Sequence, residues 1–167
     1  YEKSALSMFF YNDIPDGGDI IGQDDFSIEK NDAIQDVLLK VDQSTTNLMK
    51  SFFPLIRQGL APRRKQSIEE GNFRRLRNAK DSIINWNQNA QIIFNLIRAI
   101  SDPYPNAIGT INNKEYKVYK SEIIIKKHFN FLSFPNVPGT VIAKLFDNSL
   151  IISTKDDFLR VYTKEIQ

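Results

Sequence analysis

The sequence predicts an α/β protein in which strands and a long helix at the front are followed by a β-rich tail. Apolar residues recur at helical spacing between residues 31 and 59, whereas after residue 107 the chain breaks into short apolar runs separated by polar turns. The 167 residues are 41% hydrophobic and 25% charged, which is typical of one ordinary globular domain or two small ones.

The front is predicted to begin with two strands around a tight acidic loop. Residues 4–11 are aromatic-rich and almost continuously apolar, as in a strand that is covered on both faces. Residues 12–18 are rich in turn formers, and residues 19–28 have an extended pattern again. Because the first strand starts so near residue 1 that no neighbouring strand precedes it, we expect the chain to be the C-terminal part of a longer protein.

Two helices are predicted. The first runs from Asn31, a residue suited to the N-cap, to Gly59, and Pro54 is expected to kink or shorten its last turns. The second spans residues 87–100 and ends at the prolines of residues 101–105. Its apolar face is predicted to consist of Ala90, Ile93, Phe94 and Ile97.

The tail is predicted to form a small barrel or sandwich of six short strands. These strands are expected at residues 108–111, 115–119, 123–125, 141–146, 150–154 and 158–162. Three of the polar turns between them are Asn112-Asn113, Asp147-Asn148 and Asp156-Asp157.

Charge is distributed unevenly along the chain. Residues 1–60 carry 5 basic and 10 acidic side chains, whereas residues 61–80 carry 7 basic and 2 acidic ones. The overall net charge of +2 is too small to indicate nucleic-acid binding by itself. We therefore expect a front domain at residues 1–60, a basic linker at 61–80, and a helix with a small β domain at 81–167.

Composition excludes several classes of site. The chain has no cysteine, which rules out disulfides, thiolate metal ligands and cysteine nucleophiles. No apolar run reaches the roughly 18 residues that a membrane-spanning helix needs. We find no metal-ligand cluster and no glycine-rich nucleotide motif, and we expect a cytoplasmic protein without a metal.

The acidic loop is the first candidate for chemistry. Asp13, Asp16 and Asp19 place three carboxylates within seven residues, which suits proton transfer. The alternative is a solvated turn in which the aspartates accept hydrogen bonds from their own backbone amides. The only histidine, His128, has no motif around it, which favours a structural or surface role.

The basic segment and the only tryptophan each leave two interpretations open. Arg63-Arg64-Lys65 and Arg74-Arg75-Leu76-Arg77 suit phosphate binding, because guanidinium groups match phosphate oxygens, or else form a solvated linker. Trp86 is expected to anchor the core, and the alternative is stacking on a base or ring.

Several segments match, in order, the motifs of one family. They are Phe-Phe-Tyr-Asn-Asp-Ile-Pro-Asp-Gly-Gly-Asp-Ile-Ile-Gly-Gln at 9–23, Asp-Ser-Ile-Ile-Asn-Trp at 81–86, Asn-Leu-Ile-Arg-Ala at 95–99, Asp-Pro-Tyr-Pro-Asn-Ala at 102–107, Pro-Gly-Thr-Val at 138–141 and Glu-Ile-Gln at 165–167. Together they resemble the 10-formyltetrahydrofolate-dependent formyltransferases. Where the family has glycine in Pro-Tyr-Pro-Gly-Ala, this chain has Asn106, which can also adopt a left-handed conformation.

The resemblance implies a fold and a function. The fold is the C-terminal part of a Rossmann-like formyltransferase domain followed by a small OB-like domain. The function is transfer of a formyl group from 10-formyltetrahydrofolate to the amine of a nucleotide-linked amino sugar, in an enzyme that resembles the homodimers of this family. Two alternatives are methionyl-tRNA formyltransferase, with tRNA as partner, and a non-catalytic dimerisation or binding module.

The resemblance also implies roles for single residues. Asp16 corresponds to the acidic member of an Asn, His, Asp catalytic set. The family's upstream Asn-x-His-Pro segment is absent, so the chain alone is expected to be catalytically incomplete. The folate would be bordered by Asn12, Asp13, Ile14 and Asp16, and the loop would be supported by Gly18 and Asp19. The residues expected to contact the acceptor substrate are Arg75, Arg77, Trp86 and Tyr104.

Overall fold

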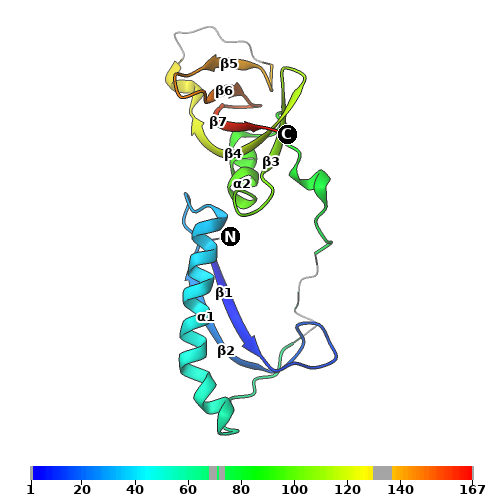
Figure 1. Cartoon of the computed structure of the whole chain (residues 1–167), viewed down its shortest axis with the longest axis vertical. Coiled ribbons are helices and arrows are strands. Elements are labelled where there is room, and N and C mark those ends of the chain that lie inside the picture. Colours follow the sequence, from blue (N-terminus) through cyan, green and yellow to red (C-terminus); the bar gives the residue numbers. More distant parts are fainter. Residues whose placement is uncertain (1, 68–70, 72–73, 130–136, 167) are drawn as a thin grey trace. The chain divides into compact units, whose positions relative to one another are not determined.

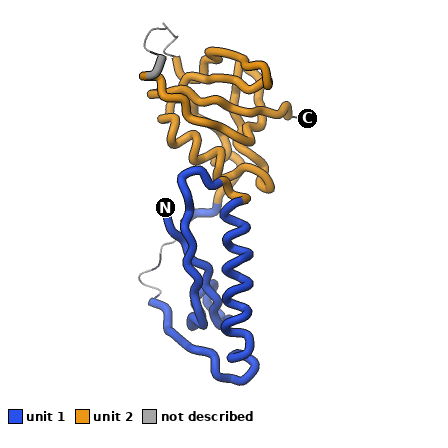
Figure 2. The backbone as a smooth tube through the Cα atoms, turned by 90° about the vertical axis from the view of Figure 1, so that its left-hand side faces the viewer, with its two compact units in different colours: residues 1–32, 36–76 blue, residues 33–35, 77–167 orange. Residues whose placement is uncertain are grey.

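The computed structural model describes residues 2–67, 71, 74–129 and 137–166, and the chain divides into two compact units (Figures 1 and 2). Unit 1 comprises residues 1–32 and 36–76, and unit 2 comprises residues 33–35 and 77–167. The division after residue 76 places most of the basic segment with the front of the chain.

Unit 1 begins with an antiparallel hairpin. Strand β1 (Lys3–Phe9) pairs with β2 (Ile20–Ser27), with an irregularity between Met8 and Phe9, so the prediction of two strands around an acidic loop is confirmed. The expectation that the first strand is covered on both faces is wrong for the described residues. Residues 3–5 are exposed and residues 6–9 are only half-buried, because β2 is the one strand that pairs with β1 there.

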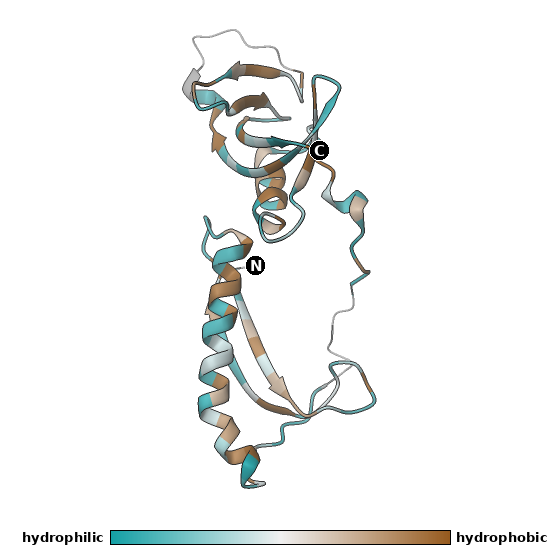
Figure 3. Cartoon of the chain, viewed as in Figure 1, coloured by the Kyte–Doolittle hydropathy of each residue, from teal (hydrophilic) through white to brown (hydrophobic). Residues whose placement is uncertain are grey.

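Helix α1 (Ile34–Arg57) packs against this hairpin (Figure 1). Its Phe52 ring fills the space beside Gly22 of β2, and Leu48 is only 3% exposed. Figure 3 shows hydrophilic and hydrophobic bands alternating along α1, as the helical spacing predicts. One stripe of the helix therefore covers the hairpin while the other meets water.

The ends of α1 differ in part from the prediction. The helix begins at Ile34, three residues after Asn31, and it continues through Pro54 to Arg57. Proline removes a hydrogen bond to the carbonyl of Lys50, but Lys50 is exposed, so water can replace that bond. The stop at Gly59 is confirmed: its φ is 72°, and the N–H of Leu60 donates to Leu55 at 2.9 Å across the turn.

Unit 2 contains a five-stranded antiparallel sheet with the order β3-β4-β7-β6-β5. The strands are β3 (Ala107–Ile111), β4 (Lys114–Ile124), β5 (Val141–Lys144), β6 (Leu150–Ser153) and β7 (Phe158–Glu165), with short 3₁₀ turns η2 (Ala79–Ser82) and η3 (Lys126–Phe129).

The predicted number of strands was wrong by one among the described residues. The strands expected at 115–119 and 123–125 are a single strand, β4, which has a bulge between Val118 and Lys120. Lys120 and Glu122, whose polarity suggested a turn, point away from the core while Ser121 between them is buried. The bulge shifts the alternation, so the buried residues Val118 and Ser121 are three positions apart, and the strand continues through the polar residues.

Helix α2 (Ala90–Ala99) supplies one side of the unit 2 core. Ala90, Ile93 and Ile97 are at most 2% exposed, and Phe94 is half-buried against the same core, which confirms the predicted apolar face. The helix starts three residues later than expected, because Asn85 and Gln88 form a turn before it. Neither described helix is long and apolar enough to cross a membrane.

The predicted asparagine turns are confirmed. Asn112 and Asn113 connect β3 to β4 with φ of 49° and 62°, and Asn148 has φ of 63° in the turn after β5. Asn106 has φ of 73°, the left-handed conformation expected where the family has glycine.

Candidate functional site

The loop between β1 and β2 is closed by its own backbone. The N–H of Phe10 donates to the carbonyl of Asp19 at 2.9 Å, and the N–H of Gly17 donates to Ile14 at 3.0 Å. The side chain of Asn12 accepts a hydrogen bond from the N–H of Ile14 at 3.0 Å. Asparagine, rather than an aspartate, therefore stabilises this turn.

Two of the three carboxylates are left available by this arrangement. Asp13 and Asp16 are exposed, and neither carboxylate has a hydrogen bond or ion pair within the part of the chain that the structure describes. Asp19 lies 3.5 Å from the guanidinium of Arg63. The loop thus presents two unpaired negative charges at its surface and uses the third within unit 1.

The backbone around Asp16 is unusual. Asp16 has φ of 55°, a left-handed conformation that aspartate tolerates better than most residues. Gly18 is buried, and a Cβ there would collide with the carbonyl of Phe10. The loop therefore requires glycine at this position, as expected of a residue that supports it.

Residues 63–66 of the basic segment contact the loop and the start of β2. Arg64 exchanges two backbone hydrogen bonds with Ile20, at 2.8 and 3.0 Å. The side-chain amide of Gln66 donates to the carbonyls of Asp16 and Gly18, at 2.8 and 2.6 Å. Arg63 stacks on the Phe10 ring, with its guanidinium carbon 3.7 Å from the ring centre. Residues 63–66 are therefore attached to the hairpin, while the side chains of Arg63, Arg64 and Lys65 remain exposed.

Sequence reasoning missed these contacts. The Gln66 side chain reaches backbone atoms that lie 48 and 50 positions earlier, and no local pattern marks such a pair. The available signal was charge, because an acidic front part precedes a basic segment and attraction between them was to be expected.

The remaining candidates lie elsewhere. Arg75 is at the end of unit 1, where its guanidinium donates to Leu76 at 3.1 Å, while in unit 2 Arg77 donates to Asp81 at 3.4 Å. Tyr104 of unit 2 is 47% exposed. Within unit 1 the structure brings the loop candidates together, whereas Arg77, Trp86 and Tyr104 belong to unit 2.

Trp86 lies in the core of unit 2. It is 8% exposed, its indole N–H donates to the carbonyl of Thr110 at 3.0 Å, and Gly109 and Gly139 pack against its ring. These contacts favour the anchoring role over stacking on a ligand. His128 lies in η3, and its side chain is outside the described part of the chain.

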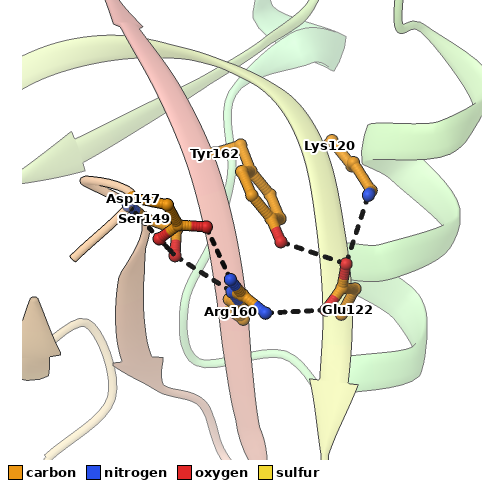
Figure 4. A network of polar contacts seen from close by, with 6 residues as sticks. All are labelled: Lys120, Glu122, Asp147, Ser149, Arg160 and Tyr162. Carbon is orange, nitrogen blue, oxygen red and sulfur yellow. Dashed lines mark hydrogen bonds and ion pairs between the residues drawn. The ribbon is translucent and has the colours of Figure 1, made fainter. Parts of the chain in front are cut away.

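A polar network covers the outer side of β4 and β7 in unit 2 (Figure 4). Arg160 of β7 pairs with Asp147 at 2.6 Å and with Glu122 at 3.4 Å, and it donates to the Ser149 hydroxyl at 3.0 Å. The hydrogen bond from Ser149 is the main cause that holds the pKa of Asp147 below its ordinary value, and Arg160 adds to it.

Glu122 is the centre of this network. It accepts a hydrogen bond from the Tyr162 hydroxyl at 3.1 Å and pairs with Lys120 at 3.2 Å. Burial alone raises the pKa of Glu122, but the bonds from Lys120 and Tyr162 outweigh it and lower the pKa. The cations of this surface are therefore already neutralised by carboxylates of the same unit.

Comparison with known families identifies the β-rich unit. The family model described as formyl transferase, C-terminal domain, matches residues 77–167. Its start coincides with the beginning of the main segment of unit 2.

Individual relatives extend the similarity across both units. A methionyl-tRNA formyltransferase of Staphylococcus aureus (strain MW2) is 30% identical over 156 residues, which are 93% of this chain and 48% of the relative. The bifunctional polymyxin resistance protein ArnA of Wigglesworthia glossinidia brevipalpis is 28% identical over 150 residues, which are 90% of this chain and 21% of that protein. The chain thus spans about half of one relative and a fifth of the other.

A solved structure shares the fold. The N-formyltransferase from Helicobacter canadensis, in complex with folinic acid and dTDP-3-aminofucose, superimposes with a TM-score of 0.68 at 22% identity. The match covers 98% of this chain and 56% of that structure's chain.

Proposed function

The chain belongs to the formyl transferase family, and from this premise we propose that it acts in N-formyl transfer from 10-formyltetrahydrofolate to the amine of a nucleotide-linked amino sugar. In this proposal unit 1 is the C-terminal part of a Rossmann-like catalytic domain, and unit 2 is a small OB-like domain. The presence of a folate and an amino sugar nucleotide in the Helicobacter canadensis structure supports this pair of substrates.

The observation that carries the proposal is the exposed carboxylate of Asp16 in a backbone-defined loop. Formyl transfer joins the acceptor nitrogen to the formyl carbon and breaks the bond between that carbon and N10 of the folate. The amine loses one proton and N10 gains one, so the reaction needs no oxidant or reductant. Asp16 accepts the proton from the attacking amine, as a general base near an exposed surface can.

The loop also suits the folate. The backbone N–H groups of Asn12 and Asp13 have no acceptor within the described residues, so they are available to the polar edge of a pterin ring. Ile14 is 49% exposed and offers an apolar contact beside them. In this arrangement Asn12, Asp13 and Ile14 orient the donor, while Asp16 faces the amine.

Methionyl-tRNA is the alternative acceptor, supported by the name of the Staphylococcus aureus relative. A tRNA would need unpaired cations, because neutralising phosphates supplies most of such binding. Arg160 and Lys120 on the outer side of the sheet are paired with Glu122 and Asp147. This pairing favours the sugar.

Homodimerisation and cytoplasmic location complete the proposal. Phe146, in the turn between β5 and β6, is fully exposed, which suits a contact between two copies. The non-catalytic module is the function that would remain if no formyl transfer were found.

The test is a formyl-transfer assay on the full-length gene product that carries these residues. It uses 10-formyltetrahydrofolate with a panel of nucleotide-linked amino sugars and with methionyl-tRNA. Asp16→Asn is expected to lower kcat on the sugar by about 10²- to 10⁴-fold, the usual contribution of a general base. Asp25→Asn, which neutralises an exposed carboxylate of β2, is the matched control and should retain activity.

Each outcome of this assay decides between the functions. Turnover of a sugar that collapses in Asp16→Asn supports the proposal. Turnover of the tRNA alone moves the function to tRNA formylation, and no turnover of either acceptor leaves the binding module.

A further inference from the structure

We propose that Gln66 is a positioning residue, which holds the backbone on both sides of the Gly17-Gly18 pair so that Asp16 points its carboxylate toward the reacting amine. The inference rests on the function proposed above, because it assigns Gln66 a role only through Asp16. Nothing in the family motifs of the sequence includes Gln66.

The contacts of Gln66 are specific in chemistry. One side-chain nitrogen donates to two carbonyl oxygens, that of Asp16 at 2.8 Å and that of Gly18 at 2.6 Å. A side-chain amide nitrogen has two N–H groups, so both bonds can form at once. The orientation of the amide is determined by its surroundings, because its oxygen would repel both carbonyls. Gln66 is half-buried, which limits competition from water.

The loop needs such a support. Asp16 has φ of 55°, and the two glycines that follow it restrict the backbone little. The N–H of Gly17 bonds to Ile14, and Gln66 adds a bond to the Asp16 carbonyl and one to the Gly18 carbonyl. The two carbonyls bound by Gln66 belong to the planes just before Gly17 and just after Gly18. Fixing both planes restricts the direction of the Asp16 side chain.

The strand-like segment around Gln66 is itself fixed. Arg64, two residues earlier, exchanges two backbone hydrogen bonds with Ile20 at the start of β2. Arg63 stacks on Phe10 and lies near Asp19, at the two ends of the loop. The amide of Gln66 is therefore presented from a segment attached to the same hairpin that carries the loop, so it can position Asp16.

The experiment compares the full-length gene product with Gln66→Ala, Asp16→Asn and the double variant. Gln66→Ala is expected to lower kcat about ten- to a hundredfold, since misplacing a catalytic group by about 1 Å has effects of that size. In the Asp16→Asn background, Gln66→Ala should lower kcat by less than about threefold, because Gln66 acts through Asp16. Gln43→Ala is the control: it removes another side-chain amide hydrogen bond, to Asn47, from exposed α1.

Gln66→Glu provides a second, isosteric variant with a pH signature. A glutamate carboxylate cannot donate to the two carbonyls, but its protonated form can donate to one of them. The activity of Gln66→Glu relative to the unmodified protein should therefore rise as the pH falls from 7 toward 5. If the two hydrogen bonds of Gln66 do not matter for activity, no such recovery is expected.

A readout without catalysis separates this inference from the proposed function. Amide hydrogen exchange at Gly17 and Gly18 is expected to be at least tenfold faster in Gln66→Ala than in Gln43→Ala. If Asp16→Asn is as active as the unmodified protein, the proposed function fails, whatever the exchange shows. Two results would overturn the positioning role. In the first, Asp16→Asn is inactive but Gln66→Ala matches Gln43→Ala in both kcat and amide exchange. In the second, the fold-loss in kcat of the double variant equals the product of the losses of the two single variants.

Discussion

Replacing Asp156 by alanine is expected to destabilise unit 2, because this side chain caps a helix from another part of the chain. Its Oδ1 accepts hydrogen bonds from the N–H of Ala90 at 2.8 Å, the N–H of Asp157 at 2.9 Å and the Thr154 hydroxyl at 3.2 Å. Asn89, which stands at the N-cap of α2, makes no capping bond with its own side chain. Asp156 therefore replaces the local cap.

The size of the effect follows from these bonds. Removing an N-cap acceptor lowers the free energy of unfolding of a protein by roughly 0.5–2 kcal/mol. The two further hydrogen bonds of Asp156 are at an exposed site and add little, so we expect Asp156→Ala to lower the free energy of unfolding of unit 2 by about 1–2 kcal/mol. For a domain the size of unit 2, each kcal/mol lowers the unfolding midpoint by about 4–8 °C. Asp156→Asn retains an acceptor without the charge, so it should fall between the unmodified protein and the alanine variant.

The dependence on pH has a definite sign. Burial raises the pKa of Asp156, but the backbone N–H groups of Ala90 and Asp157 outweigh it, so the pKa in the folded state lies below its ordinary value of 3.8. The stabilisation is therefore complete above the unfolded-state pKa and is lost as the pH falls through the folded-state pKa. The difference between the unmodified protein and Asp156→Ala should be largest well above the ordinary pKa of 3.8 and should decrease as the pH falls through the lowered pKa of the folded state.

The assay uses the fluorescence of Trp86, which is the only tryptophan and lies in the core of unit 2. Thermal unfolding followed by this tryptophan fluorescence reports on unit 2 even if unit 1 unfolds separately. Lys155→Ala, an exposed change in the same turn, is the control. The capping argument is refuted if Asp156→Ala and Lys155→Ala unfold at the same temperature at pH 7.

Two further changes test the loop and the core. Gly18→Ala should lower the rate of the proposed formyl transfer at least about tenfold, because the added Cβ would collide with the carbonyl of Phe10 and the backbone of the loop would have to move. The unfolding temperature detected by Trp86 fluorescence should stay the same. Retained activity would contradict the close packing at Gly18. Ile97→Ala should lower the free energy of unfolding of unit 2, measured in urea, by about 2–5 kcal/mol, because Ile97 is 0% exposed and its truncation leaves a cavity. A decrease below about 1 kcal/mol would show that neighbouring side chains fill the space.

Features that depend on neighbouring residues were predicted well. The face of α2, the turns at Asn112, Asn113 and Asn148, and the stop of α1 at Gly59 all agree with the structure. Each depends on side-chain periodicity or on a backbone conformation that few residue types accept. These preferences act within a few residues, so a single sequence displays them.

Predictions failed where a distant contact decides the outcome. The polar residues of β4 suggested a break in the strand, but pairing with β7 carries the strand through them. Helix α2 begins at Ala90, and the carboxylate that caps it comes from Asp156, 66 positions later. Only the folded chain brings such groups together, because hydrogen bonds of this kind have no sequence spacing of their own.

The candidate site shows the same division. The sequence by itself determined the hairpin with its acidic loop and the family to which the chain belongs, because these depend on residue types in a fixed order. The left-handed conformation of Asp16 and the close approach of Gly18 to Phe10 are seen only in the structure. The tertiary structure decided which carboxylates remain unpaired and which groups hold them: Arg63, Arg64 and Gln66 lie against the loop only once the basic segment returns alongside β2. Hydrogen bonds and ion pairs act over a few ångströms in space, and the distance between their partners along the chain is irrelevant to their strength.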